Sequence, residues 1–259
     1  MSSPLLAGLN PAQREAVLAS DGPVLILAGA GSGKTRVITH RIAHLILEKG
    51  VASDQVLAVT FTNKAAGEMK SRAEALLEGH RFRGWISTFH SLCVRILRRE
   101  AAAAGLSPSF LIYDEADQLA VVKEVLRSLD LSEKLNPPRQ LLSRISAHKN
   151  AGRTDWDQGE TFGAARFGRI AQGYQDALAK AQALDFDDLL LRAVALFDQN
   201  QPVRDAYRRR FAYLLIDEYQ DTNRVQYQLV RHLAGPQGNL TVVGDEDQSI
   251  YSWRGADIQ

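Results

Sequence analysis

The sequence has 259 residues, which is enough for one large hydrophobic core or two modest ones. Hydrophobic residues make up 45% of the chain and charged residues 24%, proportions typical of a globular protein that is soluble in water. The 31 Lys and Arg residues nearly balance the 30 Asp and Glu residues, and the formal net charge is +1. Overall charge therefore gives no argument for a nucleic-acid partner, and such an argument has to come from local residues.

The sequence also bears on the compartment in which the protein works. Cys93 is the only cysteine, so an intramolecular disulfide is impossible, and its apolar neighbours favour a buried thiol. Residues 1–7 lack a basic segment followed by a long apolar run, so we expect no signal peptide. No apolar run approaches the ~18 residues that a membrane helix needs. We expect a cytoplasmic protein.

Short apolar runs predict a parallel sheet. Buried strands are predicted at residues 24–28, 56–60, 213–216 and 240–243, with 85–87 as a weaker fifth candidate. Most of these runs are followed by apolar residues at helical spacing, as after Lys34. Continuous apolar strands that alternate with helices are typical of an α/β fold whose sheet is covered on both faces.

The middle of the chain has a different pattern. Residues 95–198 contain amphipathic helical stretches and no convincing strand; one stripe consists of Leu119, Val122, Val125, Leu126 and Leu129. Asp114 and Asp117 stand where a helix would begin. We predict a mainly helical insertion at residues 95–195, which interrupts a sheet domain formed by residues 1–94 and 196–259.

The first predicted strand leads into a glycine-rich loop. Residues 28–35 read AGAGSGKT, with Ala28 at the first glycine position of the phosphate-binding loop pattern. Small residues let backbone N–H groups approach phosphate oxygens at a helix N-terminus. Lys34 would reach the β- and γ-phosphates of ATP, and Thr35 would ligate Mg²⁺. A dinucleotide-binding turn is the nearest rival, but it needs glycine in place of Lys34. The loop residues expected to hold the nucleotide are Gly29, Ala30, Gly31, Ser32, Gly33, Lys34 and Thr35.

Two carboxylates follow the strand predicted at residues 213–216. The end of a parallel strand places Asp217 and Glu218 at the sheet edge where α/β proteins bind ligands. Asp217 would hold Mg²⁺ through water, and Glu218, a second candidate metal ligand, would position and deprotonate the attacking water. An acidic pair after an apolar strand is common by chance, so this interpretation depends on the upstream phosphate loop.

Six segments, in the expected order, resemble motifs of the UvrD-like (UvrD/PcrA/Rep-type) helicases of superfamily 1. They are residues 9–17 (Q motif), 60–66 (Ia), 88–91 (Ib), 184–190 (Id), 217–222 (II) and 243–256 (III). Ser252 stands where many relatives carry glycine. The resemblance implies a RecA-like P-loop NTPase domain, interrupted by a helical domain, that uses ATP and Mg²⁺.

The resemblance also implies roles for individual residues. Gln13 and Arg36 would contact the nucleotide, and Gln248 would sense the γ-phosphate. Single-stranded DNA, and junctions between single- and double-stranded DNA, are the implied partners. Exposed aromatic side chains stack on bases with about 1–3 kcal/mol per base. The residues implied to contact DNA are Phe61, Thr62, Asn63, Thr88, His90, Phe186, Tyr251, Trp253 and Arg254.

Plainer interpretations stay open for several of these residues. Phe61 could belong to the core, His90 could be an ordinary hydrogen-bonded histidine, and Phe186 could anchor a helix start among its three neighbouring aspartates. The arginines at 95, 98 and 99, like those at 208–210, fit solvated helix faces better than phosphate contacts.

The resemblance finally implies a motor with two RecA-like halves, in which later arginines stabilise the transition state. We therefore expect the ATP-binding front half of an ATP-dependent 3′–5′ DNA helicase, whose C-terminal half is missing. This half alone is expected to bind nucleotide and single-stranded DNA weakly, to hydrolyse ATP poorly and not to unwind DNA. The alternatives are the motor portion of a helicase–nuclease subunit and a non-catalytic module that binds single-stranded DNA.

Overall fold

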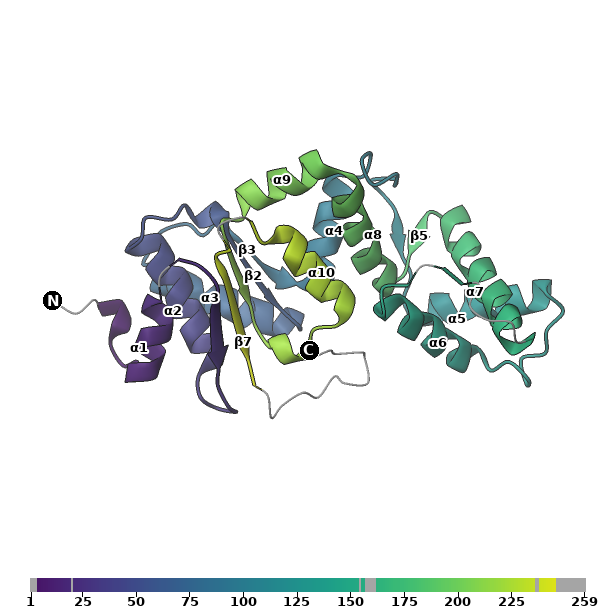
Figure 1. Ribbon diagram of the computed structural model, residues 1–259, viewed down its shortest axis with the longest axis horizontal. Coiled ribbons are helices and arrows are strands. Elements are labelled where there is room, and N and C mark those ends of the chain that lie inside the picture. The colour runs from purple at the N-terminus through teal and green to yellow at the C-terminus, as the bar shows by residue number, and fades with distance from the viewer. Residues whose placement is uncertain (1–3, 20, 154, 157–161, 236–237, 246–259) are drawn as a thin grey trace.

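The computed structural model describes residues 4–19, 21–153, 155–156, 162–235 and 238–245. Figure 1 shows a sheet flanked by helices and, at one end of an elongated molecule, a smaller group of helices. Among the described residues, no helix is long and apolar enough to cross a membrane.

The central sheet has five parallel strands in the order β1-β7-β6-β2-β3. The predicted α/β fold is confirmed, and the weaker fifth candidate is a strand. The strands are β1 (Val24–Leu27), β2 (Val56–Thr60), β3 (Trp85–Thr88), β6 (Tyr213–Ile216) and β7 (Leu240–Gly244).

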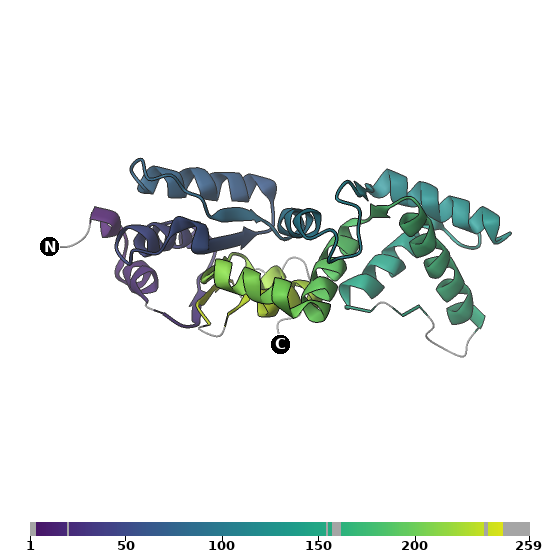
Figure 2. The same ribbon diagram turned by 90° about the horizontal axis from the view of Figure 1, so that it is seen from above.

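Helices cover both faces of this sheet, as Figure 2 shows from above. Alternate residues of one strand point to opposite faces. Ala58 of β2 packs in a cluster with α2 (Lys34–Leu47) and α3 (Asn63–Leu76). Its neighbour Leu57 packs in a second cluster with α4, α8 and α10. These helices are α4 (Phe89–Arg99), α8 (Phe186–Gln199) and α10 (Arg224–Leu233). Helix α1 (Pro11–Leu18) packs on α2, and α9 (Gln201–Arg210) packs on α8 and α10.

Strand β1 departs from the predicted pattern of buried strands. It lies at the edge of the sheet, and its residues alternate between half-buried and exposed. Leu25 is 63% exposed and Leu27 57% exposed, so one face of β1 is open to solvent. An apolar run cannot distinguish a central strand from an edge strand, because only the strand order determines which side chains find a helix to cover them.

The insertion has a core of its own. It contains α5 (Glu115–Ser128), α6 (Pro138–Asn150) and α7 (Phe162–Lys180). The predicted apolar stripe is confirmed, because Val122, Val125 and Leu126 are buried in this core. Asp114 caps α5 in a reciprocal capping box with Asp117, which confirms the predicted helix start.

The expectation that residues 95–198 hold no strand is wrong. Leu111–Ile112 (β4) and Ala183–Leu184 (β5) form a short parallel pair where the chain enters and leaves the insertion. Two residues are too few for a periodic pattern to reveal a strand. Helix α4 runs through residues 94 and 95 and α8 through residues 195 and 196, and both helices pack on the sheet. The remaining short elements are 3-10 helices: η1 (Pro4–Leu6), η2 (Ser53–Gln55) and η3 (Tyr219–Asp221).

Candidate nucleotide and nucleic-acid sites

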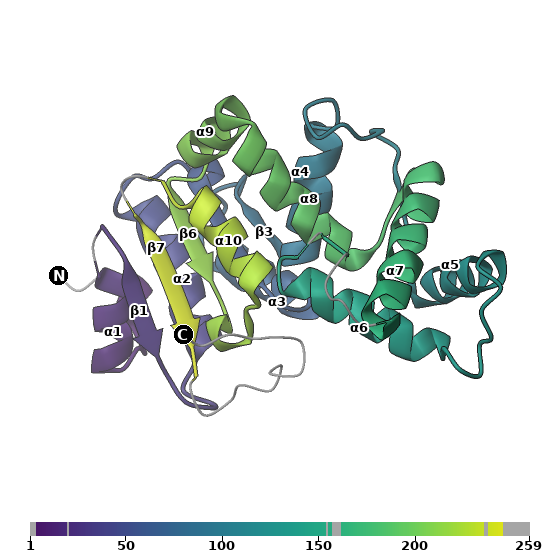
Figure 3. The same ribbon diagram turned by 45° about the vertical axis from the view of Figure 1, so that its right-hand side comes forward.

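The candidate nucleotide site lies at the carboxyl edge of the sheet. All five strands run in parallel, so the residues that follow them meet at one edge. In Figure 3 the arrowheads of β1, β6 and β7 are directed toward this edge. The glycine-rich loop follows β1, Asp217 follows β6, and Asp245 follows β7. Segments far apart in the sequence are thereby brought together.

The loop has a backbone that suits its glycines. Gly31 and Gly33 have φ angles of 70° and 89°, in the left-handed region that favours glycine. Gly33 is also the N-cap of α2, which begins at Lys34. A Cβ atom on Gly33 would lie 2.9 Å from Gln13 Nε2, the end of a flexible side chain that can shift, so it is the positive φ angle that requires glycine here.

Gln13 and Arg36, for which the family resemblance implies nucleotide contacts, lie beside the loop. Asn10 caps α1, and its backbone N–H donates to Gln13 Oε1 at 3.0 Å. This bond leaves Gln13 Nε2 directed at the loop, where it donates to the Ser32 carbonyl at 2.9 Å. Arg36 is exposed on the first turn of α2. The two side chains therefore flank the loop.

The amine of Lys34 lies between two carboxylates. Its Nζ atom is 3.2 Å from Asp245 Oδ2 and 3.9 Å from Glu218 Oε2, and the side chain is 9% exposed. A partly desolvated amine needs such partners. An incoming phosphate would have to compete with Asp245 and Glu218 for this charge.

The acidic pair is held by its own backbone and by Gln220. The Glu218 N–H donates to Asp217 Oδ1 at 3.1 Å, and Glu218 has a left-handed φ of 51°. Gln220 Nε2 donates to Glu218 Oε2 at 2.7 Å, while Gln220 Oε1 accepts from the Asp245 N–H at 3.0 Å. Burial raises the pKa of Asp217 to about 6, and the nearby charge of Glu218 acts in the same direction. A bound cation would favour the ionised form of this carboxyl.

The donors at this edge fit Mg²⁺ bound together with a phosphate. Thr35, Asp217 and Glu218 offer hydroxyl and carboxylate oxygens, which Mg²⁺ prefers over nitrogen or sulfur. Within the part of the chain that the structure describes, no group of three or more His, Cys, Asp or Glu residues could form a metal site. A cation would therefore depend on phosphate oxygens and water as well, which is common for Mg²⁺.

Sequence reasoning missed Asp245 and Gln220 as members of this site. Asp245 contacts Lys34, and Gln220 joins Glu218 to the backbone of Asp245. The available signal was the position of Asp245, two residues after the strand predicted at residues 240–243. Nothing in the sequence signals that β7 lies between β1 and β6, the order that brings Asp245 to Lys34.

The predicted DNA-contacting residues that the structure describes lie just after β2, at the end of β3 and just after it, and at the start of α8. Phe61 is half-buried against the core, with its ring centroid 5.7 Å from that of Phe89. The Thr62 and Thr88 hydroxyls accept from backbone N–H groups as the N-caps of α3 and α4. Asn63 is exposed on the first turn of α3. Both threonines therefore have a structural role in addition to any contact with DNA.

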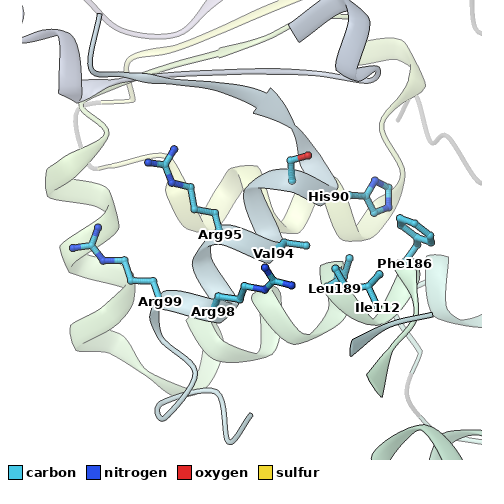
Figure 4. Close-up of a pocket in the computed structure, with 9 residues that line it drawn as sticks. His90, Val94, Arg95, Arg98, Arg99, Ile112, Phe186 and Leu189 are labelled. Carbon is cyan, nitrogen blue, oxygen red and sulfur yellow. The ribbon is translucent and has the colours of Figure 1, made fainter. Parts of the chain in front are cut away.

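His90 and Phe186 contact each other beside a pocket. Their ring centroids are 5.7 Å apart in an edge-on arrangement, and Phe186 is 47% exposed although it is a large aromatic residue. Figure 4 shows them at one end of a pocket of about 800 Å³, with Arg98 pointing into it. The pocket is lined by His90, Ser91, Val94, Arg95, Arg98, Arg99, Ile112, Phe186 and Leu189. Its apolar floor and basic rim would accept an aromatic, negatively charged ligand.

Two of the arginines that line this pocket lie over aromatic rings. The Arg95 guanidinium lies 3.7 Å from the centre of the Trp85 ring, and Arg98 lies 5.5 Å from that of Phe110. Both side chains are exposed, yet they line a concavity, where a plain solvated helix face was favoured. The remaining predicted residues, Gln248, Tyr251, Trp253 and Arg254, lie outside the described residues.

A glycine-rich loop between a strand and a helix, with an acidic pair at the end of a nearby parallel strand, defines a P-loop α/β protein. Residues 9–259 match the UvrD/REP helicase N-terminal domain, and the chain belongs to this family. It is 52% identical over 270 residues to the ATP-dependent DNA helicase PcrA of Bacillus subtilis (strain 168). It is 49% identical over 258 residues to the proteins of that name from Staphylococcus epidermidis (strain ATCC 12228 / FDA PCI 1200) and Staphylococcus aureus (strain NCTC 8325 / PS 47).

These alignments cover 98–100% of the chain but only 35% of each relative. The chain thus spans about a third of the length of the proteins that it resembles.

Proposed function

We propose that the chain is the ATP-binding part of an ATP-dependent DNA helicase of the UvrD type, which moves 3′–5′ along single-stranded DNA and acts at junctions with duplex DNA. The observation that carries this proposal is the convergence of Lys34, Glu218 and Asp245 beside the glycine-rich loop. The PcrA name of the relatives supports the DNA-dependent half of the proposal.

In the nucleotide site, the chain's own residues divide the work. The loop N–H groups and Lys34 bind the phosphates of ATP, and Gln13 and Arg36 contact the rest of the nucleotide. Thr35 and Asp217 hold Mg²⁺, with Glu218 as a further candidate ligand. Bound Mg²⁺ would neutralise charge on the phosphate oxygens. Glu218 accepts a proton from the attacking water, because its carboxylate is partly exposed and is oriented by Gln220.

The DNA site is proposed at the carboxyl ends of β2 and β3. His90 and Phe186 offer an imidazole and an exposed aromatic ring to bases, and Phe61 and Asn63 continue the path. Gln248, Tyr251, Trp253 and Arg254 complete the assignment through the family resemblance. The relatives are nearly three times as long, and their further residues would supply transition-state arginines, worth about 10³–10⁵ in rate. The 259-residue polypeptide alone should therefore bind both ligands weakly, turn over slowly and not unwind DNA.

Turnover of ATP by the chain, with and without oligo-dT, tests this function. We expect slow hydrolysis that oligo-dT stimulates and that Glu218→Gln abolishes while nucleotide binding persists. Nucleotide binding should be lost in Lys34→Ala. A chain that binds oligo-dT but no ATP would contradict the proposal and leave only a DNA-binding module. Robust strand separation by this chain alone would overturn the expected dependence on further residues.

A further inference from the structure

A buried lysine joins the insertion to the helix that carries Phe186. Lys149 lies in the last turn of α6, and its side chain is 1% exposed. Its Nζ atom is 2.7 Å from Asp185 Oδ2 and 2.7 Å from Asp188 Oδ1, both at the start of α8. Tyr174 of α7 donates a further hydrogen bond to Asp185 at 2.9 Å. All of these charges are therefore paired within the protein.

The same two aspartates fix the first turn of α8. The Asp188 N–H donates to Asp185 Oδ1 at 2.7 Å, and the Asp185 N–H donates to Asp188 Oδ2 at 3.3 Å, which is a capping box. Phe186 is the first residue of this helix, and it projects from the box toward His90. The Lys149 amine thus contacts both carboxylates of the capping box from which Phe186 projects.

The next residue, Asn150, extends the contact to the N-terminus of α10. Its Nδ2 atom donates to Asp187 Oδ1 at 3.0 Å, and its Oδ1 atom accepts from Asn223 Nδ2 at 2.6 Å. Asn223 is buried and caps α10, in a reciprocal capping box with Gln226. One asparagine therefore bridges the helix of Phe186 and the N-terminus of α10.

Asn223 stands at the end of the segment that begins with the acidic pair. Glu218 is followed by η3 and then by Thr222, whose hydroxyl donates to the Tyr219 carbonyl at 2.7 Å. Within this segment Gln220 contacts Glu218 and Asp245. A shift of Glu218 or Gln220 on nucleotide binding would therefore be passed to Asn223 along this short segment, in which only four residues separate Glu218 from Asn223.

We propose that Lys149, Asn150 and Asn223 are positioning residues of a polar link, which conveys the state of the nucleotide site to Phe186 in the DNA site. This inference rests on the proposed function. A buried ion pair contributes little net stability compared with apolar packing, but its geometry is specific. Hydrogen bonds join α6 to the starts of α8 and α10. A small displacement of one helix start therefore shifts the other, whereas apolar contacts would let the helices slide past each other.

The test is the factor by which a non-hydrolysable ATP analogue with Mg²⁺ changes the Kd of the full chain for fluorescent oligo-dT. Couplings of this kind typically amount to about 5- to 150-fold. Asn223→Ser keeps an N-cap acceptor but cannot reach Asn150. We expect the factor to fall toward 1 in this variant, while the two separate affinities each change by less than about 3-fold, a difference of about 0.7 kcal/mol.

Asn200→Ser is the matched control, because Asn200 caps α9 through the same kind of bond to the Val203 N–H. It should retain the wild-type factor. Asn150→Ala should lower the factor as Asn223→Ser does, and the double variant should lose no more than either single variant. An unchanged factor in Asn223→Ser, an equal loss in Asn200→Ser, or a wild-type factor of 1 overturns the link. Failure of the wild type to bind either ligand would instead overturn the proposed function.

Discussion

Among single residues, Asp187 has an unusual environment for a carboxylate. Burial raises its pKa from 3.8 to about 6 and the charge of Asp185 adds to the rise, whereas hydrogen bonds from Ser146 and Asn150 and the charge of Lys149 oppose it. The pKa of Asp187 is higher in the folded chain than in the unfolded chain. At a pH between these two pKa values, the folded chain keeps a proton on Asp187 that the unfolded chain releases. This residue's contribution to stability therefore falls as pH rises from 3.8 to about 6, and stays low above that.

Asp187→Asn should reduce this pH dependence. The amide oxygen can still accept from Asn150, but nothing ionises, so the variant should gain up to about 3 kcal/mol relative to wild type between pH 4 and pH 7. Urea unfolding at both pH values measures the difference. Asp217 has a pKa raised in the same direction, so the wild-type slope alone is not diagnostic. Equal pH dependence in the two proteins would contradict the assignment.

The positions of site residues were predictable where residue type and place after a predicted strand are enough to locate them. A glycine-rich loop after a strand, and carboxylates after another strand of a parallel sheet, place Lys34 and Glu218 at one edge, and their atoms lie 3.9 Å apart. The roles given to them stay predictions. The partnership of Lys34 with Asp245 was not predictable, because it depends on β7 lying beside β1. Likewise, no local pattern signals that Lys149 reaches two aspartates in another helix.

At the level of elements, the edge position of a strand determines how much its apolar side chains contribute to stability. Leu25 and Ile26 are neighbours in β1, yet Leu25 faces solvent and Ile26 packs against the helices beneath. We expect Leu25→Thr to change the free energy of unfolding by no more than about 0.5 kcal/mol. Ile26→Thr should cost about 1–3 kcal/mol, because it places a hydroxyl in a half-buried, apolar site. The shifts of the denaturant midpoint in the two variants measure these costs, provided that the m-value is unchanged. A loss in Leu25→Thr as large as that expected for Ile26→Thr would show that both faces of β1 are covered.

The lengths of the elements follow packing more than local sequence. Helices α4 and α8 continue past residues 94 and 195 because their apolar faces lie on the sheet, in the same cluster as Leu57 and Leu214. A helical period shows where a face is apolar, but not which body it packs against. Short β4 and β5 arise only when the two chain segments are brought side by side, so their pairing could not be predicted from the residues of either segment.

On the scale of the whole molecule, the apolar core of the insertion and the cores of the sheet domain meet at a polar boundary. Helices α5, α6 and α7 share one core, and the sheet with its helices has the others. The contacts of Lys149 and Asn150 with α8 and of Asn150 with Asn223 cross between them. Because apolar burial supplies most of the cooperativity within a core, we propose that the insertion opens as a unit of its own.

Ile145→Ala tests this independence by hydrogen exchange. Ile145 is fully buried in the insertion core, and its truncation should cost about 2–5 kcal/mol there. Amide protection should fall in α5, α6 and α7 while β2 and β6 keep theirs. Ile42→Ala is the matched change in the sheet domain, since Ile42 is equally buried against β2 and β6, and it should give the reverse pattern. If each variant lowered protection everywhere by the same amount, the polar boundary would be rigid enough to make the chain one cooperative unit. Nucleotide-driven motion of Phe186 would then have to involve the whole molecule.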